Sequence, residues 1–80
     1  MITLSLAGYD KNTEQLAVEY PVPAAKSAYV KTIAAVPADD QDVYAVYRLD
    51  ELQVTQIAGQ INTPVNPKLY DYFLEASAQD

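Results

Sequence analysis

Apolar and polar residues alternate with a period of two at the start of the chain, which is the pattern of strands that bury one face. The alternation runs over residues 2–7, stops at a polar, turn-rich stretch over residues 8–13, and resumes over residues 15–20. Pro21 and Pro23 end the second run, because proline has no N–H to donate to a sheet. The pattern predicts a β-hairpin. Its apolar face would consist of Ile2, Leu4, Leu6, Leu16, Val18 and Tyr20.

Residues 24–36 and 51–62 have the 3.6-residue period of amphipathic helices. Pro37 ends the first helix, and Asp50 precedes the second as its expected N-cap, with Gln53 completing a capping box. The apolar faces expected to be buried consist of Ala25, Ala28, Tyr29, Ile33 and Val36 in the first helix, and Val54, Ile57, Ala58 and Ile61 in the second.

Two further segments predict strands. Residues 43–49 are almost wholly apolar and rich in β-branched and aromatic side chains, which favours a central strand covered on both faces. Residues 69–76 alternate again and predict the last strand, with residues 77–80 as a frayed tail. One face of this strand would carry Tyr70, Tyr72 and Leu74.

The order β-β-α-β-α-β predicts an α+β fold, a two-layer sandwich in which two helices cover one face of a four-stranded sheet. A chain of 80 residues is long enough for one domain, which we expect to span residues 1–80. The opposite face of the sheet would stay uncovered. It would be lined by Thr3, Ser5, Gln15, Ala17, Glu19, Asp71, Phe73, Glu75 and one or two tyrosines of the third strand.

The composition excludes most catalytic chemistry. The chain has no His to act as a general base or zinc ligand and no Cys to act as a nucleophile. None of its serines lies in a Gly-x-Ser-x-Gly turn, and its two glycines cannot form a phosphate-binding loop. We therefore predict a protein that is not an enzyme and uses no cofactor.

An acidic cluster raises the question of a metal site. Asp39, Asp40 and Asp42 lie close together, and the separation from Asp40 to Glu51 matches the first and twelfth positions of a calcium loop. Ala45 stands where such a loop needs glycine, and the intervening run has the composition of a strand. The sequence therefore predicts no metal site.

Charge and hydropathy limit the possible partners. Five Lys and Arg stand against 11 Asp and Glu, a formal net charge of -6, which opposes binding to nucleic acid. No apolar run is long enough to cross a bilayer, and the first residues lack the basic start of a signal peptide, so we expect a cytoplasmic protein. Seven tyrosines against one phenylalanine favour a protein interface, where hydroxyl groups can be used.

The stretch from Gly8 to Pro23, GYDKNTEQLAVEYPVP, resembles the hairpin that opens a group of small acidic bacterial proteins of unassigned function. The shared pattern is an aromatic-Asp-Lys-x-Thr turn and a strand that ends in Tyr-Pro. The helix start Leu49-Asp50-Glu51 and the strand Tyr70-Asp71-Tyr72 are similar in placement, so the resemblance covers most of the chain. In size and acidity these proteins are similar to the immunity proteins of secreted polymorphic and contact-dependent toxins.

The resemblance implies an immunity protein that neutralises a cognate toxin domain, of the basic nuclease type, by stoichiometric binding as a monomer in a 1:1 complex. It supplies no functional residues, so we choose contact residues by charge and aromaticity. They are Asp39, Asp40, Asp42, Tyr44, Glu51, Asp71 and Tyr72. The sequence leaves open whether the acidic loop or the open sheet face makes the contact.

Three other hypotheses remain open at this point. A phage-encoded inhibitor such as an anti-CRISPR protein would also be small, acidic and free of catalytic groups. A small-ligand or metal-responsive regulatory domain would use the acidic loop over residues 39–42. A structural homo-oligomer would pair the edge strands of two copies.

Overall fold

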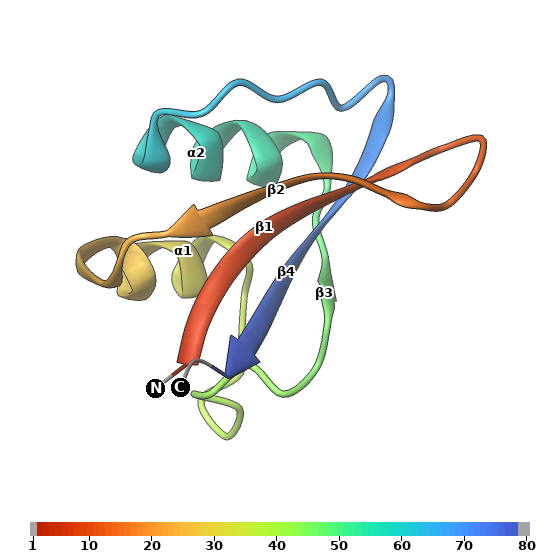
Figure 1. Cartoon of the computed structure of the whole chain (residues 1–80). Coiled ribbons are helices and arrows are strands. Elements are labelled where there is room, and N and C mark those ends of the chain that lie inside the picture. The colour runs from red at the N-terminus through yellow and green to blue at the C-terminus, as the bar shows by residue number, and fades with distance from the viewer. Residues whose placement is uncertain (1, 79–80) are drawn as a thin grey trace.

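The computed structural model describes residues 2–78, which form a four-stranded antiparallel sheet and two α-helices (Figure 1). The sheet order is β2-β1-β4-β3. The strands are β1 (Ile2–Asp10), β2 (Leu16–Val22), β3 (Tyr47–Arg48) and β4 (Tyr70–Ala78). The helices are the short 3-10 helix η1 (Ala24–Lys26), α1 (Ser27–Ile33) and α2 (Glu51–Ile61). The predicted α+β fold and its element order are confirmed. Neither α-helix of this part of the chain has the length and apolarity to cross a lipid bilayer.

The first and last strands lie side by side at the centre of the sheet (Figure 1). β1 and β4 pair antiparallel along their whole length, from Ile2 opposite Ala78 to Asp10 opposite Tyr70. The expected fraying is therefore wrong for Ser77 and Ala78, because β1 supplies their backbone partners. Residues 79–80 of the expected tail lie outside the described residues.

Both helices pack on the same face of the sheet and share one core with it (Figure 1). Leu6 and Leu74 face each other across the central pair, and both are fully buried. Gly8 lies on this face, where a Cβ atom would come within 2.6 Å of Val18 Cγ2 and 2.9 Å of Tyr72 Cε1. The close approach of these neighbours therefore requires glycine at position 8. The buried core consists of Leu4, Leu6, Val22, Val30, Ala34, Val43, Leu49, Val54, Ile57, Tyr72 and Leu74.

The first helix buries a face that matches the expected one only in part: Ile33 and Val36 pack against the core, whereas Ala25 and Ala28 are exposed. Val30 and Ala34 are buried, whereas Tyr29 is 62% exposed. The α-helix is also shorter than expected, because Ala24–Lys26 form a 3-10 turn and α1 spans only Ser27–Ile33. Leu16 is also exposed, because a bulge between Gly8 and Tyr9 places it opposite Tyr9 and away from the core.

The expected central strand over residues 43–49 is wrong: β3 is limited to Tyr47–Arg48 at the edge of the sheet, and one more backbone bond, from the Leu49 N–H to the Tyr72 carbonyl at 3.0 Å, extends its pairing with β4. The Asp40 carboxylate accepts hydrogen bonds from the backbone N–H groups of Tyr44 and Ala45, and from the Tyr47 hydroxyl. Val43 adopts a left-handed conformation with φ 54° and is buried in the core. The apolar run is therefore a loop that is anchored at Val43 and held by Asp40.

The second helix begins as the sequence predicts. Asp50 Oδ1 accepts from the Gln53 N–H at 2.8 Å, and Gln53 Oε1 accepts from the Asp50 N–H at 2.8 Å, which is a complete capping box. The Gln53 side-chain amide also donates to the Ile33 carbonyl at 3.0 Å. This bond ties the start of α2 to the end of α1. Asn62 ends α2 in the left-handed conformation.

Candidate functional site

The acidic loop that the sequence singled out is largely structural. Asp40 holds the loop together, and the hydrogen bond from Tyr47, followed by that from Tyr44 N–H, lowers the pKa of its carboxyl group. The same bond raises the pKa of the Tyr47 hydroxyl from 10.0 to about 12. Asp39 and Asp42 are exposed on this loop, and Tyr44 is 83% exposed. This loop carries charge and one exposed aromatic ring, and its central carboxylate already has internal partners.

Tyr72 is not available as a contact residue, so this expectation is corrected. Its side chain lies on the covered face of β4 and is 2% exposed. Its hydroxyl oxygen accepts a hydrogen bond from the backbone N–H of Asn66 at 2.9 Å, which holds the loop before β4. Burial raises the pKa of the Tyr72 hydroxyl. Glu51 is exposed in the first turn of α2, where a carboxylate favours the helix N-terminus.

The open face of the sheet contains a cavity of about 380 Å³. It forms where the end of β1, the hairpin turn, the first part of β4 and β3 meet. Of the predicted contact residues, only Asp71 lies in its wall. Its wall is made by Tyr9, Asp10, Glu14, Val46, Arg48, Asp71, Phe73 and Glu75. The alternation of β4 brings Asp71, Phe73 and Glu75 to this face together, as the sequence predicted for the open face.

Phe73 forms the aromatic centre of this cavity. It lies opposite Ala7 on β1 and Arg48 on β3. The Tyr9 ring meets Phe73 edge-on with 5.4 Å between the ring centroids, and the Arg48 guanidinium carbon lies 5.9 Å from the Phe73 centroid. Both are favourable aromatic geometries. Ala7 is fully buried although the helices lie on the other face, so the larger side chains around it shield it.

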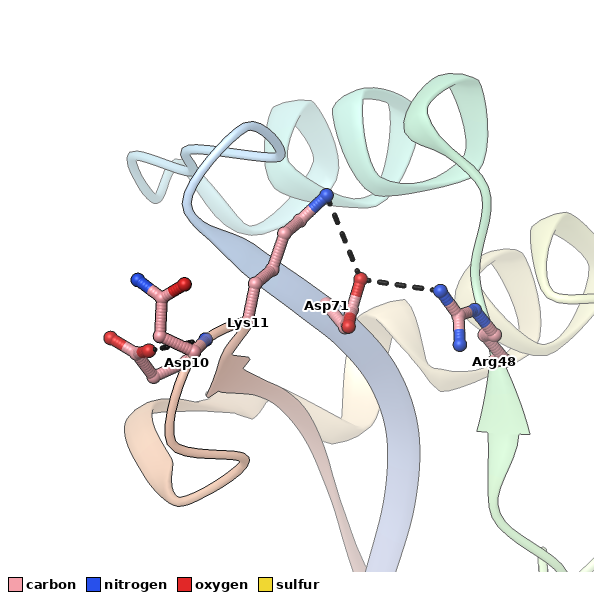
Figure 2. A network of polar contacts seen from close by, with 5 residues as sticks. Asp10, Lys11, Arg48 and Asp71 are labelled. Atoms are coloured by element: carbon pink, nitrogen blue, oxygen red, sulfur yellow. Dashed lines mark hydrogen bonds and ion pairs between the residues drawn. The ribbon is translucent and has the colours of Figure 1, made fainter.

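Asp71 joins three segments at one edge of the cavity. It accepts from Arg48 Nη2 at 3.2 Å, and Lys11 Nζ lies 3.7 Å from the same oxygen (Figure 2). Figure 2 shows the two cations reaching Asp71 from opposite sides. The Arg48 side chain is 70% exposed, so water screens this pair, and it orients the guanidinium group more than it stabilises the fold.

Two more carboxylates have defined roles at the cavity wall. Asp10 Oδ1 accepts from the N–H groups of Asn12 at 2.8 Å and Thr13 at 3.1 Å, which closes the hairpin turn. The Tyr9 hydroxyl donates to Glu75 Oε2 at 2.6 Å, and this bond, with partial burial, raises the pKa of Tyr9. A carboxylate has about four acceptor positions, so Glu75 can also accept from a bound group.

The cavity is therefore anionic and aromatic. Its wall holds four carboxylates and one guanidinium group. Within residues 2–78, no group of three or more carboxylates is arranged to hold a metal ion. This chemistry suits the recognition of a cationic group.

The sequence reasoning missed Tyr9, Asp10, Glu14, Val46 and Arg48. Tyr9 continues the alternation of β1 beyond Gly8, which was a usable signal, but the turn-forming residues around it concealed the strand. The predicted central strand over residues 43–49 would cover Val46 and Arg48 on both faces of the sheet. Their place at the cavity depends on the edge position of β3.

The fold and the cavity define a small α+β domain with an anionic, aromatic cavity on the open face of its sheet. The family model described as a domain of unknown function, DUF7683, matches residues 3–75, and the chain belongs to this family. The match spans both helices, all or most of every strand, and every residue of the cavity wall. No curated protein and no solved structure matches the chain.

Proposed function

We propose that this protein is a binding module that holds a basic protein partner against the open face of its sheet, and that the partner is a cognate toxin domain which it neutralises as an immunity protein. The observation that carries the proposal is the open-face cavity, with an aromatic centre and a carboxylate-rich wall. The net charge of -6 supports the basic character of the partner.

The arrangement has the physical features of an interface centre. Aromatic and arginine side chains dominate binding energy where they lie together and become desolvated. Phe73, Tyr9 and Arg48 form such a group, and the surrounding carboxylates would steer a cationic surface toward it.

The acidic loop is a weaker choice for the main contact. Asp40 uses its carboxylate to hold Tyr44, Ala45 and Tyr47, so a partner would compete with the loop's own hydrogen bonds. Exposed Tyr44 and Val46 extend the interface from this loop. The open face is therefore the proposed centre, and Tyr44 and Val46 are its rim.

Affinity capture from the native host tests the proposal. The tagged protein is used as bait beside Phe73→Ala and Asp42→Asn, and the captured material is washed at low and then high salt. We expect one basic protein at a 1:1 ratio, lost with Phe73→Ala and kept with Asp42→Asn, which removes one exposed charge away from the cavity. An empty capture, or a partner that Phe73→Ala holds as well as the wild type, would overturn the proposal.

A further inference from the structure

The geometry points to a guanidinium pocket: we infer that the cavity receives one arginine side chain of a basic protein partner. The inference rests on the proposed function, because it names the group by which that partner is recognised. The chain itself shows how this face treats such a group. Arg48 lies over the Phe73 ring and donates to Asp71, so aromatic and carboxylate contacts act on one guanidinium together.

Charge complementarity decides the sign of the charge that the occupant of the cavity carries. Lys11 and Arg48 both form their ion pairs with Asp71, so these two cations do not neutralise the other carboxylates of the cavity wall. The other carboxylates of the wall are those of Glu14, Glu75 and Asp10, and Asp10 lies at the hairpin turn. An anionic or neutral occupant would leave this wall uncompensated, whereas a cation would neutralise part of it.

The shape and chemistry favour arginine over lysine. A cavity of about 380 Å³ lies at the small end of the range for binding sites, which suits a single side chain. A guanidinium is planar, stacks on aromatic rings and binds carboxylates through two parallel N–H groups. An ammonium is a strongly hydrated point charge and lacks this planar match.

Titration of the whole protein with three capped tripeptides tests the inference directly. The probes are acetyl-Gly-Arg-Gly-amide, its lysine counterpart and its citrulline counterpart, which replaces the guanidinium with a neutral urea of similar shape. Binding is followed by amide chemical shifts in two-dimensional NMR at about 0.15 M ionic strength, where long-range attraction is screened. We expect saturable shifts centred on Tyr9, Phe73 and Glu75, several-fold weaker binding of the lysine peptide, and none of the citrulline peptide.

Matched variants separate the pocket from general acidity. Glu14→Gln and Asp42→Asn each remove one formal charge, but only Glu14 lines the cavity. We expect Glu14→Gln to weaken the arginine peptide several-fold and Asp42→Asn to leave it unchanged. Glu14→Gly removes the same carboxylate where φ is 61°, a conformation that glycine adopts freely, so the fold is kept and binding should fall equally.

The possible results distinguish this inference from the proposed function. Equal shifts from arginine and lysine peptides, spread over the acidic surface, would overturn the pocket. So would equal effects of Glu14→Gln and Asp42→Asn. A captured basic partner that Phe73→Ala releases, together with a tripeptide that does not bind, would overturn the pocket and leave the proposed function standing. Specific binding of the arginine peptide together with an empty capture would overturn the proposed function and leave the pocket standing.

Discussion

Neighbouring side chains along β4 lie in two different environments. Tyr72 and Leu74 face the helices and are 2% and 0% exposed, whereas Asp71, Phe73 and Glu75 face the open side and are partly exposed. The covered side is joined to both helices by apolar contacts, and the open side is joined to Tyr9, Lys11 and Arg48 by aromatic and charged ones.

The comparison shows how a strand with a period of two can separate the side chains that stabilise the fold from those that we propose to bind a partner. Burial of apolar area stabilises a fold in proportion to the area removed from water, and the covered side supplies that area. Screened ion pairs and partly exposed rings contribute little to folding, but they remain available to a partner. Substitutions on the two sides of β4 test this separation.

Leu74→Ala and Phe73→Ala give the largest contrast. We expect Leu74→Ala to lower the free energy of unfolding by about 2–5 kcal/mol, because it leaves a cavity in a fully buried position. Phe73→Ala should cost only about 1 kcal/mol, since the ring is partly exposed. Urea denaturation measures both. Equal losses would mean that the open face carries as much of the stability as the core.

Gly8→Ala tests the tight packing of the covered face. The added methyl group would meet Val18 and Tyr72 at distances below 3.0 Å, so we expect a loss of about 1–3 kcal/mol. Gly59→Ala is the matched control, because nothing lies within 4 Å of its Cβ position in α2. There alanine should stabilise the protein by about 0.5–1 kcal/mol. Thermal melts that moved both variants in one direction would contradict the packing argument.

Tyr72→Phe isolates one hydrogen bond on the covered face. The ring stays in place, but the Asn66 N–H loses its acceptor, and we expect a loss of about 1 kcal/mol. Hydrogen exchange should be faster at Asn66. Tyr44→Phe, at an exposed ring, should leave unfolding unchanged. A Tyr72→Phe variant with the same free energy of unfolding as the wild type would show that this bond does not hold the loop before β4.

The contribution of Tyr47 to the stability of the fold should depend on pH. Tyr47 pairs with Leu74 in the register of β3 and β4, and its hydroxyl donates to Asp40, which raises the pKa of Tyr47 from 10.0 to about 12. A raised pKa means that the bond stabilises the fold fully below pH 10 and is lost as the pH rises toward about 12. The difference in melting temperature between wild type and Tyr47→Phe should therefore shrink over that interval. A constant difference would assign the effect to packing instead.

Local patterns were sufficient for much of the fold. The period of β1, the capping box of Asp50 and Gln53, and the alternation of β4 all depend on residues near one another in the chain. The short length of β3 could not be predicted from local patterns. The apolar run over residues 43–49 has the composition of a strand, although most of it is a loop held by Asp40. The hydrogen bonds of Asp40 are local, reaching Tyr44, Ala45 and Tyr47, but the residue types of this segment do not distinguish such a loop from a strand.

The site was harder to predict than the fold. Asp71, Phe73 and Glu75 came to the open face as expected, but their neighbours Tyr9 and Arg48 arrive through strand pairing between distant segments. Tyr72 illustrates a different error. The alternation already placed it beside Leu74, and choosing it by residue type ignored that register.

The placement of β1 and β4 at the centre of the sheet has a consequence for the order of folding. The β1–β2 hairpin can form early from neighbouring residues, but the ladder from Ile2 to Ala78 must bring together segments separated by nearly the whole chain. Pairing at this separation is slow. Until β4 arrives, the inner edge of β1 exposes backbone groups on which another chain could pair. Repulsion between chains of charge -6 protects the molecule during that interval.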